Sequence, residues 1–94
     1  MSKRFETGSV YVTNGIDTRM AEDNDFANFV NESFYKHCNG DWGTLDEEDW
    51  AMNDRALAKG DDRIFSRYEF NGDAIYIITE WDRSATTILF PDEY

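Results

Sequence analysis

The clearest pattern of polar and apolar positions lies between residues 63 and 81, where two runs with a period of two flank Asn71-Gly72. An Asn-Gly pair between such runs is typical of a two-residue type I′ turn, and this loop length fixes the register of the strands. We therefore predict a β-hairpin of strands 63–70 and 73–81. The pairs expected on its helix-facing side are Phe70 with Asp73, Tyr68 with Ile75, Ser66 with Ile77, and Ile64 with Thr79.

A third strand is predicted from Thr86 to Phe90, after a polar connection over residues 82–85. Pro91 ends this strand because proline cannot donate a hydrogen bond to the ladder. With a four-residue loop, the same face of the sheet stays inward. The expected pairs are then Trp81 with Thr86, Thr79 with Ile88, and Ile77 with Phe90.

The other face of this three-stranded sheet carries apolar side chains that no predicted helix is left to cover. They are Phe65, Tyr76, Ile78 and Leu89. An exposed apolar face of this kind indicates a partner surface. One alternative for the function is therefore a homodimeric structural module that associates through this face.

The apolar period changes to that of an α-helix after Asn24. Asn24 or Asp23 is expected to cap this helix, and Asn39-Gly40 to end it. The residues on its apolar face are Phe26, Phe29, Val30, Ser33, Phe34 and His37.

A second helix is predicted between Thr44 and Gly60. Thr44 and Glu47 have the spacing of a capping box, with Thr44 as the N-cap. Three polar residues, Asp46, Asp49 and Asn53, fall within the inward arc of this helix, where polar groups need partners. They indicate either an exposed first turn with a contact from Asn53 to a loop, or a half-buried polar site.

The N-terminal part of the chain is less regular. Residues 1–8 are polar without periodicity and are expected to fray. Residues 9–13 predict a short strand closed by an Asn14-Gly15 turn, and residues 16–23 an irregular segment or a single helical turn. The resulting order is β-α-α-β-β-β, a single α+β domain over residues 1–94 in which an antiparallel meander sheet packs on two helices in two layers.

The chain of 94 residues is strongly acidic, with 20 acidic and 9 basic side chains and a formal net charge of −11. This charge repels nucleic acid and anionic lipid, so direct binding to either is disfavoured. It favours a basic surface, such as that of a protein or complex that itself binds nucleic acid. Solubility alone is the other explanation of such acidity.

Acidic side chains form rows on the outer faces of both predicted helices. Duplex DNA presents a phosphate about every 3.4 Å along each strand, and carboxylates in comparable rows imitate it. The candidate partner-binding residues are Glu47, Glu48, Asp54, Asp61 and Asp62 on and beyond the second helix, and Glu22, Asp23, Asp25 and Glu32 on and before the first.

Motifs for cofactor chemistry are missing from the sequence. It has no phosphate loop, dinucleotide-binding glycine pattern, paired-cysteine zinc motif or histidine pair on one helix face. We therefore expect no cofactor, no metal and no catalytic residue. The single cysteine, Cys38, together with the lack of a secretory signal pattern and of an apolar run of about 20 residues, predicts a cytoplasmic protein without a membrane span.

A polar pocket is the alternative to the acidic faces. His37 lies within an apolar arc, a pattern that fits both a hydrogen-bonded core histidine and a functional one. In the second case, a small enzyme or ligand-binding domain would use a pocket where the helices meet the 82–84 turn, with Arg83 meeting Asp46, Asp49 or Asn53. The residues of this pocket would be His37, Asp41, Asp46, Asp49, Asn53, Asp82, Arg83 and Ser84.

Four motifs resemble those of a family of short bacterial proteins found on plasmids and phages. They are H-x-x-G-D-W-G at 37–43, L-D-E-E-D at 45–49, N-D-x-A-L at 53–57 and I-I-T-E-x-D-R-S-A-T-T-I-L-F-P-x-E-Y at 77–94. Members of this family are described as plasmid-related proteins of unknown function or as type I restriction modification-subunit-like. The resemblance implies a home on mobile genetic elements, where small acidic proteins often blunt host restriction or CRISPR defence. It does not imply methyltransferase activity, because the chain lacks the glycine-rich loop and its only proline is Pro91.

Charge, size and resemblance together predict a non-enzymatic interaction protein of a mobile element. Its acidic helix faces would act as a DNA mimic and occupy the nucleic-acid-binding surface of a defence or DNA-processing complex. Such a protein would have anti-restriction or anti-CRISPR activity.

Overall fold

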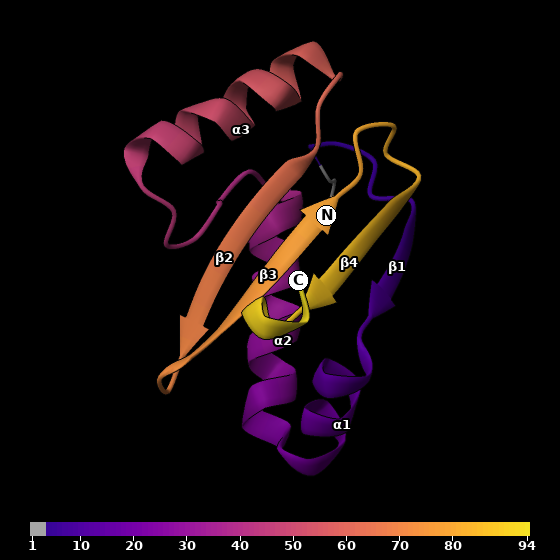
Figure 1. Cartoon of the computed structure of the whole chain (residues 1–94), viewed down its shortest axis with the longest axis vertical. Coiled ribbons are helices and arrows are strands. Elements are labelled where there is room, and N and C mark those ends of the chain that lie inside the picture. The colour runs from indigo at the N-terminus through magenta and orange to yellow at the C-terminus, as the bar shows by residue number, and fades with distance from the viewer. Residues whose placement is uncertain (1–3) are drawn as a thin grey trace.

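The computed structural model describes residues 4–94, which form an α+β structure, as the sequence predicts (Figure 1). In chain order the elements are β1 (Ser9–Val12), α1 (Asn14–Glu22), α2 (Asn24–Cys38), α3 (Glu47–Lys59), β2 (Ile64–Phe70), β3 (Asp73–Thr79), β4 (Ala85–Leu89) and the 3₁₀ turn η1 (Pro91–Glu93). Residues 1–3 of the segment expected to fray lie outside the described range.

The sheet is mixed rather than purely antiparallel. Its strand order is β1-β4-β3-β2, in which β2, β3 and β4 form the predicted antiparallel meander. β1 lies parallel to β4 at the edge, with Ser9 opposite Ala85 and Val12 opposite Ile88. The prediction of a pure meander is wrong in this respect, because pairing between strands so far apart in the chain leaves no local pattern in the sequence.

The β2–β3 hairpin has the register that Asn71-Gly72 predicts, from Phe70 opposite Asp73 to Ile64 opposite Thr79. Asn71 adopts a φ of 51° and Gly72 a φ of 82°, as a type I′ turn requires.

The predicted β3–β4 register is wrong. Thr79 pairs with Thr86 and Ile77 with Ile88, because the loop begins one residue earlier than expected: the Glu80 N–H donates to the Ala85 carbonyl at 2.9 Å. This displacement moves the partner of each residue by two positions. The same side chains therefore still face the helices.

Residues 14–22 form a helix, so the prediction of an irregular segment or a single turn is wrong. The Thr13 side chain caps α1 by accepting from the Ile16 N–H at 3.4 Å, and Asp17 lies in the first turn, where the helix dipole favours an acid. Asp23 ends α1 and caps α2, since its carboxylate accepts from the N–H groups of Asp25 and Phe26.

Two apolar clusters form the core. The larger cluster joins α1 and α2 to the sheet and contains Ile16, Phe26, Val30, Tyr68, Ile75, Ile77 and Ile88. The smaller cluster, under α3, is centred on Trp42, which is fully buried and packs with Ala56 and Ile64. Phe5 packs against this cluster and Thr7 is fully buried. The prediction that the N-terminal segment frays is therefore wrong for residues 4–8.

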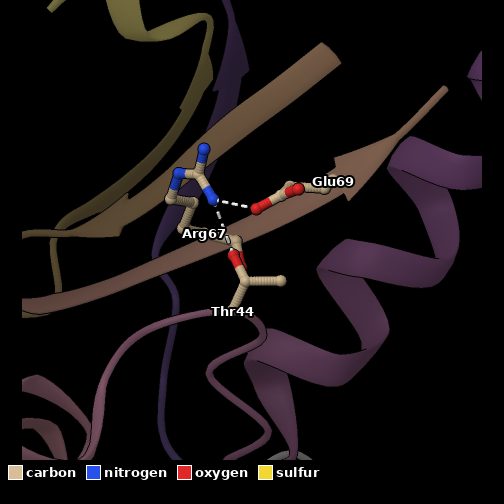
Figure 2. Close-up of polar contacts among 3 residues, drawn as sticks. All are labelled: Thr44, Arg67 and Glu69. Carbon is tan, nitrogen blue, oxygen red and sulfur yellow. Dashed lines mark hydrogen bonds and ion pairs between the residues drawn. The ribbon is translucent and has the colours of Figure 1, made fainter. Parts of the chain in front are cut away.

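The outer edge of β2 is covered by another part of the chain, and we call it the sealed edge. Arg67 donates its N–H to the Trp42 carbonyl at 3.2 Å, and its carbonyl accepts from the Thr44 N–H at 2.8 Å. The Arg67 guanidinium also donates to Thr44 Oγ1, at 2.9 Å, and to the Glu69 carboxylate; Figure 2 shows the three side chains together. A Cβ on Gly43 would lie 1.9 Å from the Arg67 carbonyl oxygen, so only glycine allows this approach.

Asn53 of α3 extends the sealed edge by one more residue of β2. Its amide nitrogen donates to the Phe65 carbonyl, and its Oδ1 accepts from the Phe65 N–H at 3.1 Å. One side chain therefore replaces both hydrogen bonds that a neighbouring strand would make. The outward backbone groups of Phe65 and Arg67 are consequently all occupied.

The outer edge of β1 has no such cover, and we call it the open edge. In Figure 1, β1 lies at the margin of the sheet with no element beyond it. All four of its residues are exposed, including the apolar side chains of Val10 (47%), Tyr11 (57%) and Val12 (38%). The sheet therefore has two edges of opposite character.

Candidate functional site

His37 lies in a buried chain of hydrogen bonds that crosses the sheet. Its Nδ1 is 2.5 Å from Ser66 Oγ, and its Nε2 is 2.9 Å from Thr79 Oγ1. Thr79 Oγ1 is in turn 2.6 Å from Thr86 Oγ1, which donates to the Thr7 carbonyl at 2.8 Å. These hydrogen bonds join α2 to three strands and to the N-terminal segment.

Which group donates in each of these hydrogen bonds follows from the fact that a hydroxyl has a single proton to donate. Because Thr86 donates to Thr7, Thr79 must donate to Thr86. Thr79 then accepts from the Nε2–H of His37. In this tautomer Nδ1 is an acceptor, so the Ser66 hydroxyl donates to it at 2.5 Å and not to the Ile77 carbonyl, which lies 3.4 Å away. The imidazole is neutral, since burial lowers the pKa of His37 to about 3.

Asp41 stabilises the loop between α2 and α3. Its carboxylate accepts from the Gly43 N–H at 3.1 Å, and its carbonyl accepts from the Tyr68 hydroxyl at 2.6 Å. Burial of the Tyr68 ring raises the pKa of its hydroxyl, which keeps this donor protonated.

Asp46, not Thr44, is the N-cap of α3, so the predicted capping box is wrong. The Asp46 carboxylate accepts from the Asp49 N–H at 2.8 Å, and both acids are exposed. Thr44 is unavailable for capping because its N–H and hydroxyl bond to Arg67 in the sealed edge.

The guanidinium of Arg83 is bound to backbone carbonyls, not to Asp46, Asp49 or Asn53 as the sequence predicts. It donates to the carbonyls of Asp62 at 2.5 Å and of Ala56, Glu80 and Trp81 at 3.2 Å each. The Ala56 carbonyl also accepts from the Gly60 N–H at 2.8 Å, and the negative C-terminal end of the helix dipole attracts the cation. Arg83 therefore ties the β3–β4 loop to the C-terminal end of α3.

Asp82 and Ser84 stabilise the same loop. The Asp82 carboxylate accepts from the hydroxyl of Ser84 at 2.6 Å and from its N–H at 3.1 Å. These two bonds lower the pKa of Asp82. A turn-stabilising role thus accounts for both side chains.

A surface groove of about 290 Å³ between α3 and β2 brings together only Asp49 and Asn53 of the eight polar residues proposed for a pocket. Its other lining residues are Leu45, Met52, Asp62, Arg63 and Phe65. Asp62 belongs to the acidic residues proposed to bind a partner. Arg63 was not predicted as a site residue, because only its position after two acids distinguishes it in the sequence. Its guanidinium donates to the Tyr94 hydroxyl at 2.7 Å.

The nine acidic residues proposed to bind a partner form two groups. The α3 acidic group is Glu47, Glu48, Asp54, Asp61 and Asp62, and the α1–α2 acidic group is Glu22, Asp23, Asp25 and Glu32. All are exposed except Asp23, which is half-buried as a helix cap. Asp54 also has a structural contact, since it accepts from Trp42 Nε1–H at 2.9 Å.

Within residues 4–94, these acids form no ion pair with a basic side chain. The ion pairs found in residues 4–94 join Arg19 to Asp73 and Arg67 to Glu69, and neither uses a member of the two groups. Figure 1 places α3 and the α1–α2 junction at opposite ends of the molecule, whose longest extent is 39 Å. The acids thus form two separate clusters of carboxylates.

The back face of the sheet is less open than the sequence predicts. Ile78 and Leu89 are each only 6% exposed. Phe65 and Tyr76 are half-buried, and both contact the ring of Tyr94, which follows η1. The prediction of an uncovered apolar face is wrong because the residues after Pro91 fold back over it.

Within residues 4–94, no three His, Cys, Asp or Glu side chains are grouped to hold a metal ion. No helix in this range has the length and apolar character needed to cross a membrane. Comparisons of the chain with protein-family models, with curated proteins and with solved structures found no match.

Proposed function

We propose that this is a non-enzymatic interaction protein that presents its two acidic groups to a basic, nucleic-acid-binding surface of another protein or complex. The proposal is carried by one observation: nine carboxylates, eight of them exposed, have no ion pair within residues 4–94. In a chain with a net charge of −11, such groups attract an external cationic surface.

The size of the molecule supports mimicry of a nucleic acid. Its longest extent of 39 Å is close to one turn of duplex DNA, roughly 34–36 Å. The acidic groups lie toward the two ends of this axis (Figure 1). A basic surface shaped for one turn of duplex could therefore meet both groups at once.

The groove between α3 and β2 offers a place for a basic side chain of the partner. Leu45, Met52 and Phe65 provide apolar surface, and Asp49 and Asp62 provide carboxylates. A lysine or arginine side chain has an apolar stem and a charged end, and this combination suits such a groove. The biological setting that we propose, a mobile element that counters host restriction or CRISPR defence, rests on the sequence resemblance alone.

The test is capture of partners from a cell lysate at graded salt, followed by elution with duplex DNA. The first variant carries Glu47→Lys, Glu48→Lys and Asp61→Lys. Asp54 is left unchanged because it bonds to Trp42. We expect the wild type to retain a nucleic-acid-binding protein at low salt, duplex DNA to elute it, and the variant to lose at least ten times its yield.

A charge-matched control separates these acids from net charge. Asp17→Lys, Glu80→Lys and Asp92→Lys change the charge equally at exposed positions outside both groups. The control should keep most of the partner. Equal loss in both variants, no retained nucleic-acid-binding protein, or a partner that DNA does not displace would each refute the proposal.

A further inference from the structure

Three Asn-Gly pairs occur in the chain, at 14–15, 39–40 and 71–72. An asparagine followed by glycine can cyclise, because the backbone nitrogen of the glycine can attack the side-chain amide carbon and glycine has no Cβ to hinder the approach. The reaction needs an attacking N–H that is not already hydrogen-bonded, and a side-chain amide that is free to turn toward it. The three pairs differ in both requirements.

Two of the pairs are held by their surroundings. At the end of α2, Asn39 Nδ2 donates to the Tyr35 carbonyl at 2.9 Å, and the Gly40 N–H donates to the His37 carbonyl at 3.3 Å. Cyclisation there would have to break both bonds.

The pair at 14–15 lies in the first turn of α1, where the helical backbone restrains it. The Gly15 N–H also bonds to the Glu93 carboxylate. This acid lies so close that a Cβ on Gly15 would be 2.6 Å from its Oε2. The attacking nitrogen of this pair is therefore occupied as well.

Asn71-Gly72 has none of these restraints. Both residues are exposed at the tip of the β2–β3 hairpin (Figure 1), and nothing lies within 4 Å of the position that a Cβ on Gly72 would take. The strand pairing ends with Phe70 opposite Asp73, so the ladder does not use the Gly72 N–H. Within residues 4–94, neither this N–H nor the Asn71 side chain has a hydrogen-bond partner. The attacking group and the group attacked are both free.

We propose that Asn71 is a site of spontaneous covalent modification, where the side chain deamidates through a cyclic imide. The Gly72 nitrogen forms a bond to Asn71 Cγ and gives its proton to hydroxide. The Cγ–Nδ2 bond breaks, and Nδ2 takes a proton from water and leaves as ammonia. A second water molecule then opens the ring at one of its two carbonyls. The product is an aspartate or an isoaspartate, and water is the only co-reactant.

The two products differ in their effect on the hairpin. Both add a negative charge two positions before Asp73, whose carboxylate pairs with Arg19 of α1. The aspartate keeps the turn, because Asp-Gly suits a type I′ turn as Asn-Gly does. The isoaspartate adds one carbon to the main chain, so the loop loses the length that sets Phe70 opposite Asp73. Modification therefore adds charge in both products and loosens the hairpin in one.

Peptide mapping by mass spectrometry tests the site in the full chain during incubation in mildly alkaline buffer. In the folded protein, Asn71 should convert at least ten times faster than Asn14 or Asn39. The rate should rise with pH, because the attacking nitrogen must lose its proton. In urea the three asparagines should convert at comparable rates, since each is followed by glycine and none is held by structure.

Asn71→Asp is the reference for the products, because it carries the same added charge on an unaltered main chain. The isoaspartate form, separated by chromatography, should unfold at a lower urea concentration than this variant. The aspartate form should unfold together with it.

Three results would overturn the proposal. Asn14 or Asn39 could convert as fast as Asn71 in the folded protein. Asn71 could stay unmodified in the folded protein over a time in which all three asparagines convert in urea. The preference for Asn71 could also persist in urea, which would assign it to the neighbouring sequence instead of the fold. An isoaspartate form as stable as Asn71→Asp would refute the loosened hairpin.

Discussion

The two edges of the sheet differ in how the chain treats exposed backbone. At the sealed edge, a loop and one asparagine side chain satisfy the outward groups of Phe65 and Arg67. At the open edge, the outward groups of Val10 and Val12 face away from the rest of the protein. An edge can therefore be closed without adding a strand, provided that a side chain supplies a donor and an acceptor at the right spacing.

The side chains near the two edges differ in burial as well. Behind the sealed edge lie Trp42, Phe5 and the ring of His37, which contact one another edge-on or tilted. At the open edge, the side chains of β1 are all exposed. Substitutions near the sealed edge should consequently cost stability, and substitutions of the exposed side chains in the open edge should cost little.

The largest effect is expected from Trp42→Ala. This ring is fully buried and packs on Ala56 and Ile64, and truncation of a buried aromatic residue costs about 3–5 kcal/mol. Urea denaturation measures the loss. Trp81→Ala makes the same chemical change at a side chain that is 63% exposed and should cost less than about 0.5 kcal/mol. Equal costs would contradict the assignment of Trp42 to the core.

A second effect concerns acid stability. The folded-state pKa of His37 is about 3, against an ordinary value of 6.5, so below pH 6.5 the unfolded chain binds a proton that the folded chain excludes. Stability therefore falls as the pH decreases from 6.5 toward 3, by about 1.4 kcal/mol per unit from this residue. Denaturation of the wild type and of His37→Gln at several pH values gives the difference.

Parallel pH profiles for the two proteins would refute this account of His37. Nitrogen NMR of the wild type provides a check that does not depend on the folding of the variant. It should show an imidazole protonated at Nε2 alone, with no titration above about pH 4.

A smaller effect is expected from Asn53→Ala. The variant leaves the N–H and C=O groups of Phe65 without their partner, at a cost of about 1–3 kcal/mol, and it turns part of the sealed edge into a second open edge. Urea denaturation measures the loss of stability. Asn31→Ala at an exposed position of α2 is the control and should not change the stability.

The smallest effect on stability belongs to Tyr11→Thr in the open edge. Threonine keeps the β propensity of the strand, and the tyrosine is 57% exposed, so the free energy of unfolding should change by less than about 0.5 kcal/mol. Urea denaturation of the variant and the wild type measures the difference. A loss of stability above about 1 kcal/mol would mean that Tyr11 packs within the monomer.

Local chemistry made the hairpin predictable, because Asn71-Gly72 determines both the turn type and the register. The next register was not predictable from the loop residues, since Arg83 adopts a φ of 61°, a conformation that its sequence does not signal. Helix α1 was not predicted because Asn14-Gly15 was interpreted as a turn, although Thr13 is a suitable N-cap and Asp17 a favourable acid in the first turn. The parallel partner of β1 depends on contacts across most of the chain.

The candidate site was predicted in the same uneven way. The exposure of the acidic side chains follows from their charge, and eight of the nine are exposed. The polar residues near His37 could not be assigned to partners from the sequence, because Ser66, Thr79 and Thr86 come from three different strands. Their alignment depends on the sheet register, which periodicity alone does not determine.

The pairing of β1 with β4 also affects how fast the protein can fold. Thr7 and Thr86, which bond across this part of the structure, are 79 positions apart in the chain, and contacts between such distant residues slow folding. Until β4 is in place, β1 lacks its only neighbouring strand in the described sheet and is free to pair with other chains. Folding at high concentration should therefore compete with aggregation through Ser9–Val12, and dilution should raise the yield of refolded protein.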